Sequence, residues 1–115
     1  MKVVNVIKNG TLVQAGVSVS TVNTTRLIEV SNTITVCAQH IGGTITITLK
    51  WSPNGKDFIT QAAAAAVGSD VSAVTTGVLA WDNFILPALA QAVEITVTEN
   101  NAAPITNLDL DLLCT

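Results

Sequence analysis

The sequence predicts an all-β protein: a single antiparallel β-sandwich, jelly-roll-like, of about eight strands. Three observations support this prediction. Apolar and polar residues alternate along several segments, threonine and β-branched residues fill these segments, and turn-forming residues separate them about every ten residues. Alternation with period two places one face of each strand in a core. Because 115 residues fit one domain, we expect residues 1–115 to form a single sandwich.

Four segments alternate most clearly: residues 33–38, 44–51, 93–98 and 107–112. Aliphatic side chains on one side of each segment alternate mainly with threonine, asparagine or aspartate on the other, which suits a half-buried pleated surface. Trp51 continues the apolar side of its segment, so we expect it in the core. Weaker alternation completes the expected set of strands: residues 3–7, 12–19, 26–30 and 77–84.

Four turn signals separate these segments: Asn9-Gly10, Gly42-Gly43, residues 52–55 and residues 100–104. Asn9-Gly10 lies between two apolar runs and is the strongest short hairpin signal in the chain. In residues 52–55, Pro53 fixes φ at the first central position of a turn, and Asn54 or Gly55 accepts a positive φ.

One segment departs from this alternation. Residues 61–66 are a glutamine followed by five alanines, and glycine and serine follow closely. Alanine favours helix, but a run this short cannot hold a helix alone. We interpret the segment as a long connection, with one helical turn, across one end of the sandwich. The alternative is a strand whose small side chains pack closely on a neighbour.

Charge is scarce in this chain. Charged residues make up 11% of the sequence, the net charge is −3, and no basic cluster is present, which argues against a nucleic-acid partner. The longest apolar run, residues 62–67, is far too short to span a membrane, and we recognise no signal peptide. Soluble monomers usually carry more charge. The composition therefore favours a domain packed among many copies, the alternative being simply an uncharged β-protein.

Residues capable of chemistry are few and scattered. His40, the only histidine, follows a predicted strand and precedes a glycine pair, so we expect it exposed in a loop rather than bound to a metal. Cys37 lies three residues away on the opposite face, which argues against a nucleophile–base dyad. We expect Cys37 and Cys114 to be small buried side chains. A disulfide between them requires the C-terminal strand to lie beside that of Cys37.

Asp109 and Asp111 point to the same face of one strand. The carboxyl groups of a glycosidase face each other across a cleft, so we interpret this pair as a solvated outer face, paired across strands with Lys50 or Arg26. Calcium binding is the alternative. Neither a Gly-x-Ser-x-Gly motif nor a glycine-rich phosphate loop is present. We therefore expect no enzymatic activity, no metal and no cofactor.

Trp81 is the aromatic residue whose role is least clear from the sequence. It shares its face of the predicted strand with Leu79 and Asn83, while Phe84 lies on the other face with Asp82. We interpret Trp81 as a core residue, and an exposed binding side chain is the alternative.

The hairpin at residues 34–58 resembles one found in small phage β-sandwich proteins. It reads Gly-Thr-apolar-Thr-apolar from residue 43, Ser-Pro-Asn-Gly at residues 52–55, and then Phe58. Such proteins include capsid decoration (cement) proteins and tail or fibre modules, and galactose-binding-like jelly rolls share the hairpin. Residues 86–88, 93–98 and 108–112 are similar to the closing strands of these domains. Because Arg26 is the only arginine, the chain lacks the arginine and aromatic cluster of a lectin pocket.

The resemblance implies a capsid decoration protein that resides in the virion after assembly in the host cytoplasm. It would bind the outer capsid through many weak contacts made together. Its partners would be a major capsid or other virion protein and itself, as a homotrimer or another homo-oligomer. Residues 1–19 would extend as an N-terminal arm toward a neighbour's sheet edge.

The residues expected at partner contacts are Val3, Val4, Val13, Ala63, Ala64, Ala65 and Trp81. One alternative is a carbohydrate-binding jelly-roll module, whose site would contain Trp81 and the loop ending at Thr76. Others are a phage tail or fibre component and a surface adhesin subunit.

Overall fold

A computed structural model of the chain describes residues 2–23, 33–60, 70–75, 77, 79–85 and 90–114. The strands in these residues are β1 Lys2–Leu12, β2 Val17–Asn23, β3 Thr33–Ile41, β4 Thr44–Ser52, β5 Ile59–Thr60, β6 Asp70–Thr75, β7 Ala80–Ile85, β8 Ala92–Glu99 and β9 Ile105–Cys114. The expected strand 26–30 and the alanine run at 61–66 lie outside the described residues. The described part of the chain contains no helix long and apolar enough to cross a membrane.

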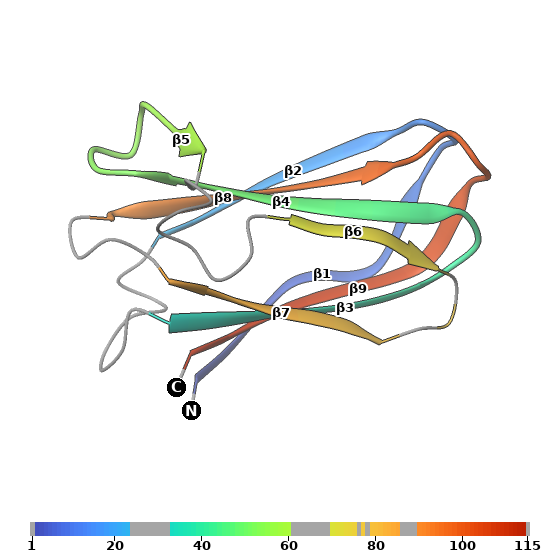
Figure 1. The fold of residues 1–115 in the computed structure, drawn as a ribbon, viewed down its shortest axis with the longest axis horizontal. Helices are drawn as coiled ribbons and strands as arrows, with labels where there is room; N and C mark the ends of the chain where they lie inside the picture. The colour runs from blue at the N-terminus through green and yellow to red at the C-terminus, as the bar shows by residue number, and fades with distance from the viewer. Residues whose placement is uncertain are drawn as a thin grey trace.

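The strands form two antiparallel sheets that lie face to face, as Figure 1 shows. One sheet has the order β1-β9-β3-β7, and the other has the order β2-β8-β4, with β5 and β6 on successive parts of the far edge of β4. β1 therefore pairs with β9, β2 with β8, β3 with β7, and β4 with β6. This is the pairing of one long hairpin rolled up into two layers, which is the jelly-roll topology. The predicted antiparallel β-sandwich is confirmed.

The core lies between the two sheets, where the alternating strands place their apolar side chains. Its most deeply buried members are Ile34, Val36, Ile45, Ile47, Leu49, Phe84, Val93, Ile95, Val97, Leu108, Leu110 and Leu112, each at most 1% exposed. Trp51 is half-buried and packs against this core, as expected. The period-two patterns of β3, β4, β8 and β9 are therefore confirmed.

The first turn of the chain is not where the sequence suggests. Asn9-Gly10 lies within β1, where Asn9 has a φ of 50° and the register with β9 shifts. An extra residue of this kind is a β-bulge, and the same tolerance of positive φ that suits Asn-Gly to a hairpin suits it to a bulge. The hairpin prediction at Asn9-Gly10 is therefore wrong.

The chain instead turns between residues 13 and 16. Ala15 has a φ of 59°, and the Gly16 N–H donates to the Val13 carbonyl at 2.8 Å. The expected strand 12–19 is thus interrupted by this turn. Residues 2–19 form β1, the turn and the beginning of β2, paired with β9 and β8 of the same chain, and do not extend as the arm that we expected.

The remaining turns agree with the sequence. Gly42 and Gly43 join β3 to β4, which lie in different sheets, with φ values of 82° and 52° in the left-handed region that favours glycine. A Cβ at Gly43 would also lie 2.6 Å from the Ala103 carbonyl oxygen, so glycine is needed there for space as well. In the turn after β4, Gly55 takes the positive φ, at 79°.

Candidate functional site

The outer face of the β1-β9-β3-β7 sheet gathers several of the residues that the sequence singles out. The register pairs Trp81 with Cys37, Cys37 with Asp111, and Asp111 with Asn5. Directly paired residues project from the same face of a sheet, so these four form one row across all four strands. We call this row, together with the adjacent row of Asn83, Thr35, Leu113 and Val3, the Trp81 face.

Trp81 is 62% exposed, so our interpretation of it as a core residue is wrong. Phe84 fills the core in its place and is completely buried. Alternation along β7 does put the two aromatic rings on opposite faces, as expected. The pairing with β3 decides which face is inside, because Phe84 lies opposite the core residue Ile34.

Further large apolar side chains are exposed on or beside this face. Val3 of β1 is 55% exposed. Leu79, two residues before Trp81, and Ile85, the last residue of β7, are also exposed. Single exposed apolar residues are normal, but a group of them that includes a tryptophan marks an interaction surface. The Trp81 face therefore has the composition of a binding surface.

The carboxylates on this sheet are held by β1. The Asn5 Nδ2 donates to Asp111 Oδ1 at 2.8 Å, and the Asn9 main-chain N–H donates to Asp109 Oδ1 at 2.9 Å. The expected pairing with Lys50 is wrong, because Lys50 belongs to the other sheet, opposite Glu94. Arg26 lies outside the described residues. The two carboxylates thus lie side by side on one sheet, not across a cleft.

Cys37 is half-buried in the middle of the Trp81 face. Burial and the neighbouring negative charge of Asp111 raise the pKa of the Cys37 thiol, so the reactive thiolate is disfavoured. β9 does lie beside β3, but the register places Cys114 opposite Ile34, three residues from the position of Cys37. Cys37 is a free thiol, and the disulfide does not form.

His40 is completely buried, so the prediction of an exposed loop position is wrong. β3 continues to Ile41, and His40 takes the next inward position after Ala38. Its Nε2 lies 3.3 Å from the Gly43 carbonyl oxygen, and its Nδ1 has no hydrogen-bond partner among the described residues. In that part of the chain, histidine, cysteine, aspartate and glutamate nowhere gather in a group of three that could hold a metal.

Glu99 is the polar residue that sequence reasoning missed. It is 1% exposed, and its carboxylate accepts main-chain N–H bonds from Ala15 at 3.0 Å, Thr44 at 3.2 Å and Ala102 at 2.9 Å. Burial alone would raise the pKa of Glu99, but these N–H groups and that of Ala103 lower it overall. The available signal was position, because residue 99 continues the inward side of residues 93, 95 and 97.

The three Glu99 contacts lie in the three turns at one end of the sandwich. These turns join β1 to β2, β3 to β4, and β8 to β9, and each crosses from one sheet to the other. Glu99 therefore ties the two sheets together at this end. Its role is structural, because its carboxylate accepts hydrogen bonds from main-chain N–H groups of the chain itself.

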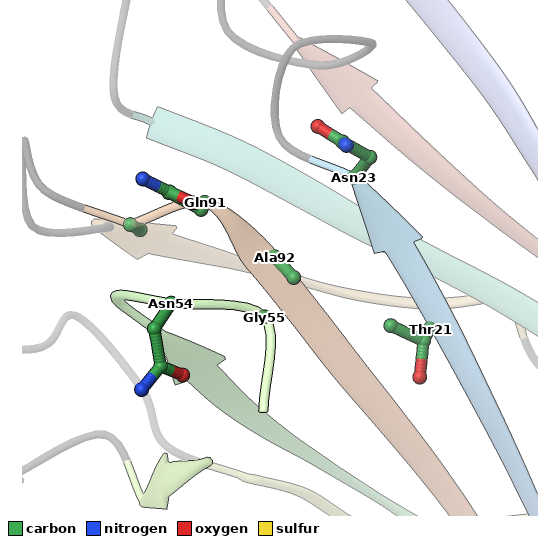
Figure 2. Close-up of a pocket in the computed structure, with 7 residues that line it drawn as sticks. Thr21, Asn23, Asn54, Gly55, Gln91 and Ala92 are labelled. Carbon is green, nitrogen blue, oxygen red and sulfur yellow. The ribbon is translucent and has the colours of Figure 1, made fainter. Parts of the chain in front are cut away.

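A hollow of about 770 Å³ lies at the opposite end of the sandwich. It is lined by Thr21, Asn23, Asn54, Gly55, Ala90, Gln91 and Ala92. Figure 2 shows that the amide groups of Asn23, Asn54 and Gln91 do not converge on one point. The Asn54 amide is also used within its own turn, where Oδ1 accepts the N–H groups of Lys56 and Asp57. The polar groups of the hollow are therefore less well arranged to bind a ligand than the side chains of the Trp81 face.

The expected contact residues differ in how accessible they are. Val3, Val13 and Trp81 are exposed, whereas Val4 is part of the core, which removes it as a surface candidate. Ala63, Ala64, Ala65 and Thr76 lie outside the described residues.

Comparison with known proteins shows likeness in fold. No family model and no curated protein sequence matches the chain. The structure of PBSX exported protein XepA has a TM-score of 0.69 at 14% identity and covers 96% of this chain, which spans 35% of the XepA chain. The SPBc2 prophage-derived protein YomS has a TM-score of 0.59 at 9% identity, with 96% of this chain and 90% of that chain covered.

A carbohydrate-binding module of the β-sandwich superfamily has a TM-score of 0.52 at 13% identity, covering 94% of this chain and 50% of that chain. At these identities the likeness concerns the fold alone. The chain is thus a β-sandwich that resembles prophage-derived proteins and a carbohydrate-binding module.

Proposed function

We propose that this chain is a virion structural protein, a capsid decoration protein that binds the outer surface of a phage shell through its Trp81 face. The observation that carries the proposal is a tryptophan that is 62% exposed on the outer side of the edge strand β7, on a sheet face with other exposed apolar side chains. The fold likeness to the prophage-derived protein YomS supports a phage context. The proposed activity is adhesion, without catalysis.

Trp81 has the character of an interface anchor. Tryptophan is enriched among the residues that dominate binding energy, because its large ring buries much apolar area and loses little side-chain entropy. The ordered Asn5–Asp111 pair lies in the same row of the face, beyond Cys37, and offers hydrogen-bonding groups whose positions are already fixed. One such face gives modest affinity, and many copies on one shell, or several in one oligomer, multiply it.

The test is co-sedimentation of the purified protein with heads of the phage that encodes it, assembled without this gene. We expect the wild-type protein to pellet with the heads and Trp81→Ala to bind at least about tenfold more weakly. Ile59→Ala is the matched control, since Ile59 is also exposed but lies on β5 of the other sheet. Binding to purified tails instead of heads would assign the protein to the tail. Equal binding by wild type and Trp81→Ala would refute the role of the Trp81 face.

Carbohydrate binding is the second candidate, and one observation favours it. An exposed tryptophan can stack on a sugar ring, while amide and carboxylate groups farther along the same sheet face bond the hydroxyl groups of the sugar. A glycan array with wild type and Trp81→Ala separates the two candidates. Signals that vanish in Trp81→Ala support the sugar site, and a blank array for both proteins rejects it.

A further inference from the structure

β2 differs from the other strands at the edges of the two sheets. It runs for seven residues, Val-Ser-Val-Ser-Thr-Val-Asn, and its register with β8 is continuous. β1 contains Lys2 and Lys8 and shifts register with β9, while β7 contains Asp82 and β6 contains Asp70. β5 has only two residues. Charges and bulges on edge strands prevent unwanted pairing, so among the described strands β2 is the long edge without this protection.

The main-chain groups on the free side of β2 can be identified from the ladder with β8. The Glu99 N–H donates to the Gly16 carbonyl at 2.9 Å, so Gly16 and Glu99 form a hydrogen-bonded pair. Such pairs alternate with non-hydrogen-bonded pairs in an antiparallel ladder. Val17, Val19 and Thr21 therefore direct their N–H and C=O groups away from β8, toward the side on which no described strand lies.

We propose that a second copy of this chain pairs with this edge, β2 against β2, antiparallel and centred on Val19. In this register Val19 lies opposite Val19 of the second copy, and Val17 lies opposite Thr21. The three pairs would exchange about six main-chain hydrogen bonds. The result is a twofold dimer in which the two β2-β8-β4 sheets form one continuous sheet. A twofold interface of this kind is closed, because each edge satisfies the other.

The residues at this edge suit a copy of themselves. β2 carries no charge, so antiparallel self-pairing places no like charges opposite each other in any register, whereas β1, β6 and β7 each contain at least one charged residue. Val17 and Val19 are more than half exposed in the single chain, and each would gain a cross-strand neighbour. The Trp81 face belongs to the other sheet and stays available in the dimer.

The first experiment measures the mass of the protein in solution by light scattering after size exclusion. We expect twice the 11.9 kDa of one chain for the wild type, and one chain for Val19→Lys, which would set two lysines opposite each other. Val3→Lys is the matched control, since Val3 is equally exposed on the other sheet, and it should remain dimeric. Trp81→Ala should also remain dimeric, which separates this inference from the proposed function. A wild-type mass of one or three chains would overturn the inference.

The second experiment fixes the register. Paired Cα atoms at a hydrogen-bonded position lie about 5.5 Å apart, within the range that a disulfide spans. Under mild oxidation we expect Val19→Cys to give a disulfide-linked dimer, while wild type and Val3→Cys, which share the native cysteines, stay largely unlinked. Linking of Val3→Cys as efficiently as Val19→Cys would contradict pairing through β2. Circular dichroism of each variant confirms that it is folded.

Discussion

The two sheets of the sandwich present different outer faces. The Trp81 face combines tryptophan, valine and a carboxylate that is hydrogen-bonded to Asn5, and the strand β1 at its margin shifts register repeatedly against β9. The outer face of the other sheet is regular across β2, β8 and β4. It is built around Thr46, Thr48, Thr96 and Thr98, which we call the threonine face, and pairs Thr46 with Thr98 and Thr48 with Thr96 in an unbroken register.

This difference separates two kinds of contact. Bulges and lysines make the β1 edge unsuitable for pairing, so the first sheet can interact mainly through its face. The four threonines of the threonine face are small and half-buried and offer little area to anchor a partner. The exposed side chains of their rows, Val17 and Val19, lie on the regular edge strand β2. We infer that one sheet adheres by its face and the other by its edge.

The largest predicted effect is a difference in stability between variants of the two aromatic residues on opposite faces of β7. Phe84→Ala should lower the free energy of unfolding by about 3–5 kcal/mol, because it leaves a cavity between the sheets. Trp81→Ala, three residues away, should change it by no more than about 0.5 kcal/mol, because the ring is mostly in solvent. Urea unfolding of both variants measures the difference. Equal losses would mean that Trp81 is packed against other residues in solution, which would contradict an exposed Trp81 face.

The next effect concerns the carboxylate that ties the two sheets. Glu99→Gln replaces one acceptor oxygen by an NH₂ group that faces main-chain N–H donors, so we expect a clear loss of thermal stability at pH 7. Glu94→Gln is the control, since Glu94 is half-buried on the outer face of the same strand and should change stability much less. Thermal unfolding followed by circular dichroism measures both.

The pH dependence of the same variant follows from the pKa of Glu99, which is lowered in the folded state. Its contribution is present above the unfolded-state pKa of about 4.3 and is lost as pH falls through the lower folded-state pKa. Wild type should therefore lose stability on acidification below about pH 4 more steeply than Glu99→Gln. If stability fell with pH in parallel for the two proteins, the main-chain N–H contacts would not lower the pKa of Glu99.

The turns show where sequence reasoning succeeds and where it fails. Gly42-Gly43 is read correctly because both residues must take positive φ, and the flanking segments alternate cleanly up to the turn. Asn9-Gly10 carries the same local signal, yet it forms a bulge. The local preference for positive φ is satisfied in both cases. Only the pairing of β1 with β9, set by residues about a hundred positions away, decides between a turn and a bulge.

The candidate site was less predictable than the fold, and for a related reason. Alternation shows that Trp81 and Phe84 face opposite ways, but both are large and apolar, so the sequence alone does not say which one is inside. The prediction for His40 was wrong because β3 continues to Ile41, so that His40 lies in the strand and faces the core instead of lying in a loop. Both errors concern polar or aromatic residues near strand ends, where tertiary pairing overrides the local pattern.

A smaller effect tests the chemistry within the Trp81 face. Asp111→Asn removes a negative charge that raises the pKa of the Cys37 thiol, so that pKa should fall. Alkylation of Cys37 at a fixed pH near 8 should then be faster, by less than about tenfold, because burial continues to raise the pKa. Asp109→Asn is the control, because the causes of the raised pKa are burial and Asp111. An unchanged alkylation rate in Asp111→Asn would place Cys37 and Asp111 farther apart than their register indicates.

The smallest predicted effect concerns the threonine face. Thr96→Val keeps the shape of a half-buried side chain and removes one hydroxyl group, so we expect the free energy of unfolding to change by no more than about 0.5 kcal/mol. Head binding should match that of wild type, because in our proposal this face makes no contact with the shell. If Thr96→Val abolished head binding while Trp81→Ala preserved it, the adhesive face would belong to the β2-β8-β4 sheet. The dimer edge and the adhesive surface would then belong to one sheet, and both could be used together, because pairing of two β2 edges leaves the outer faces of the joined sheets uncovered.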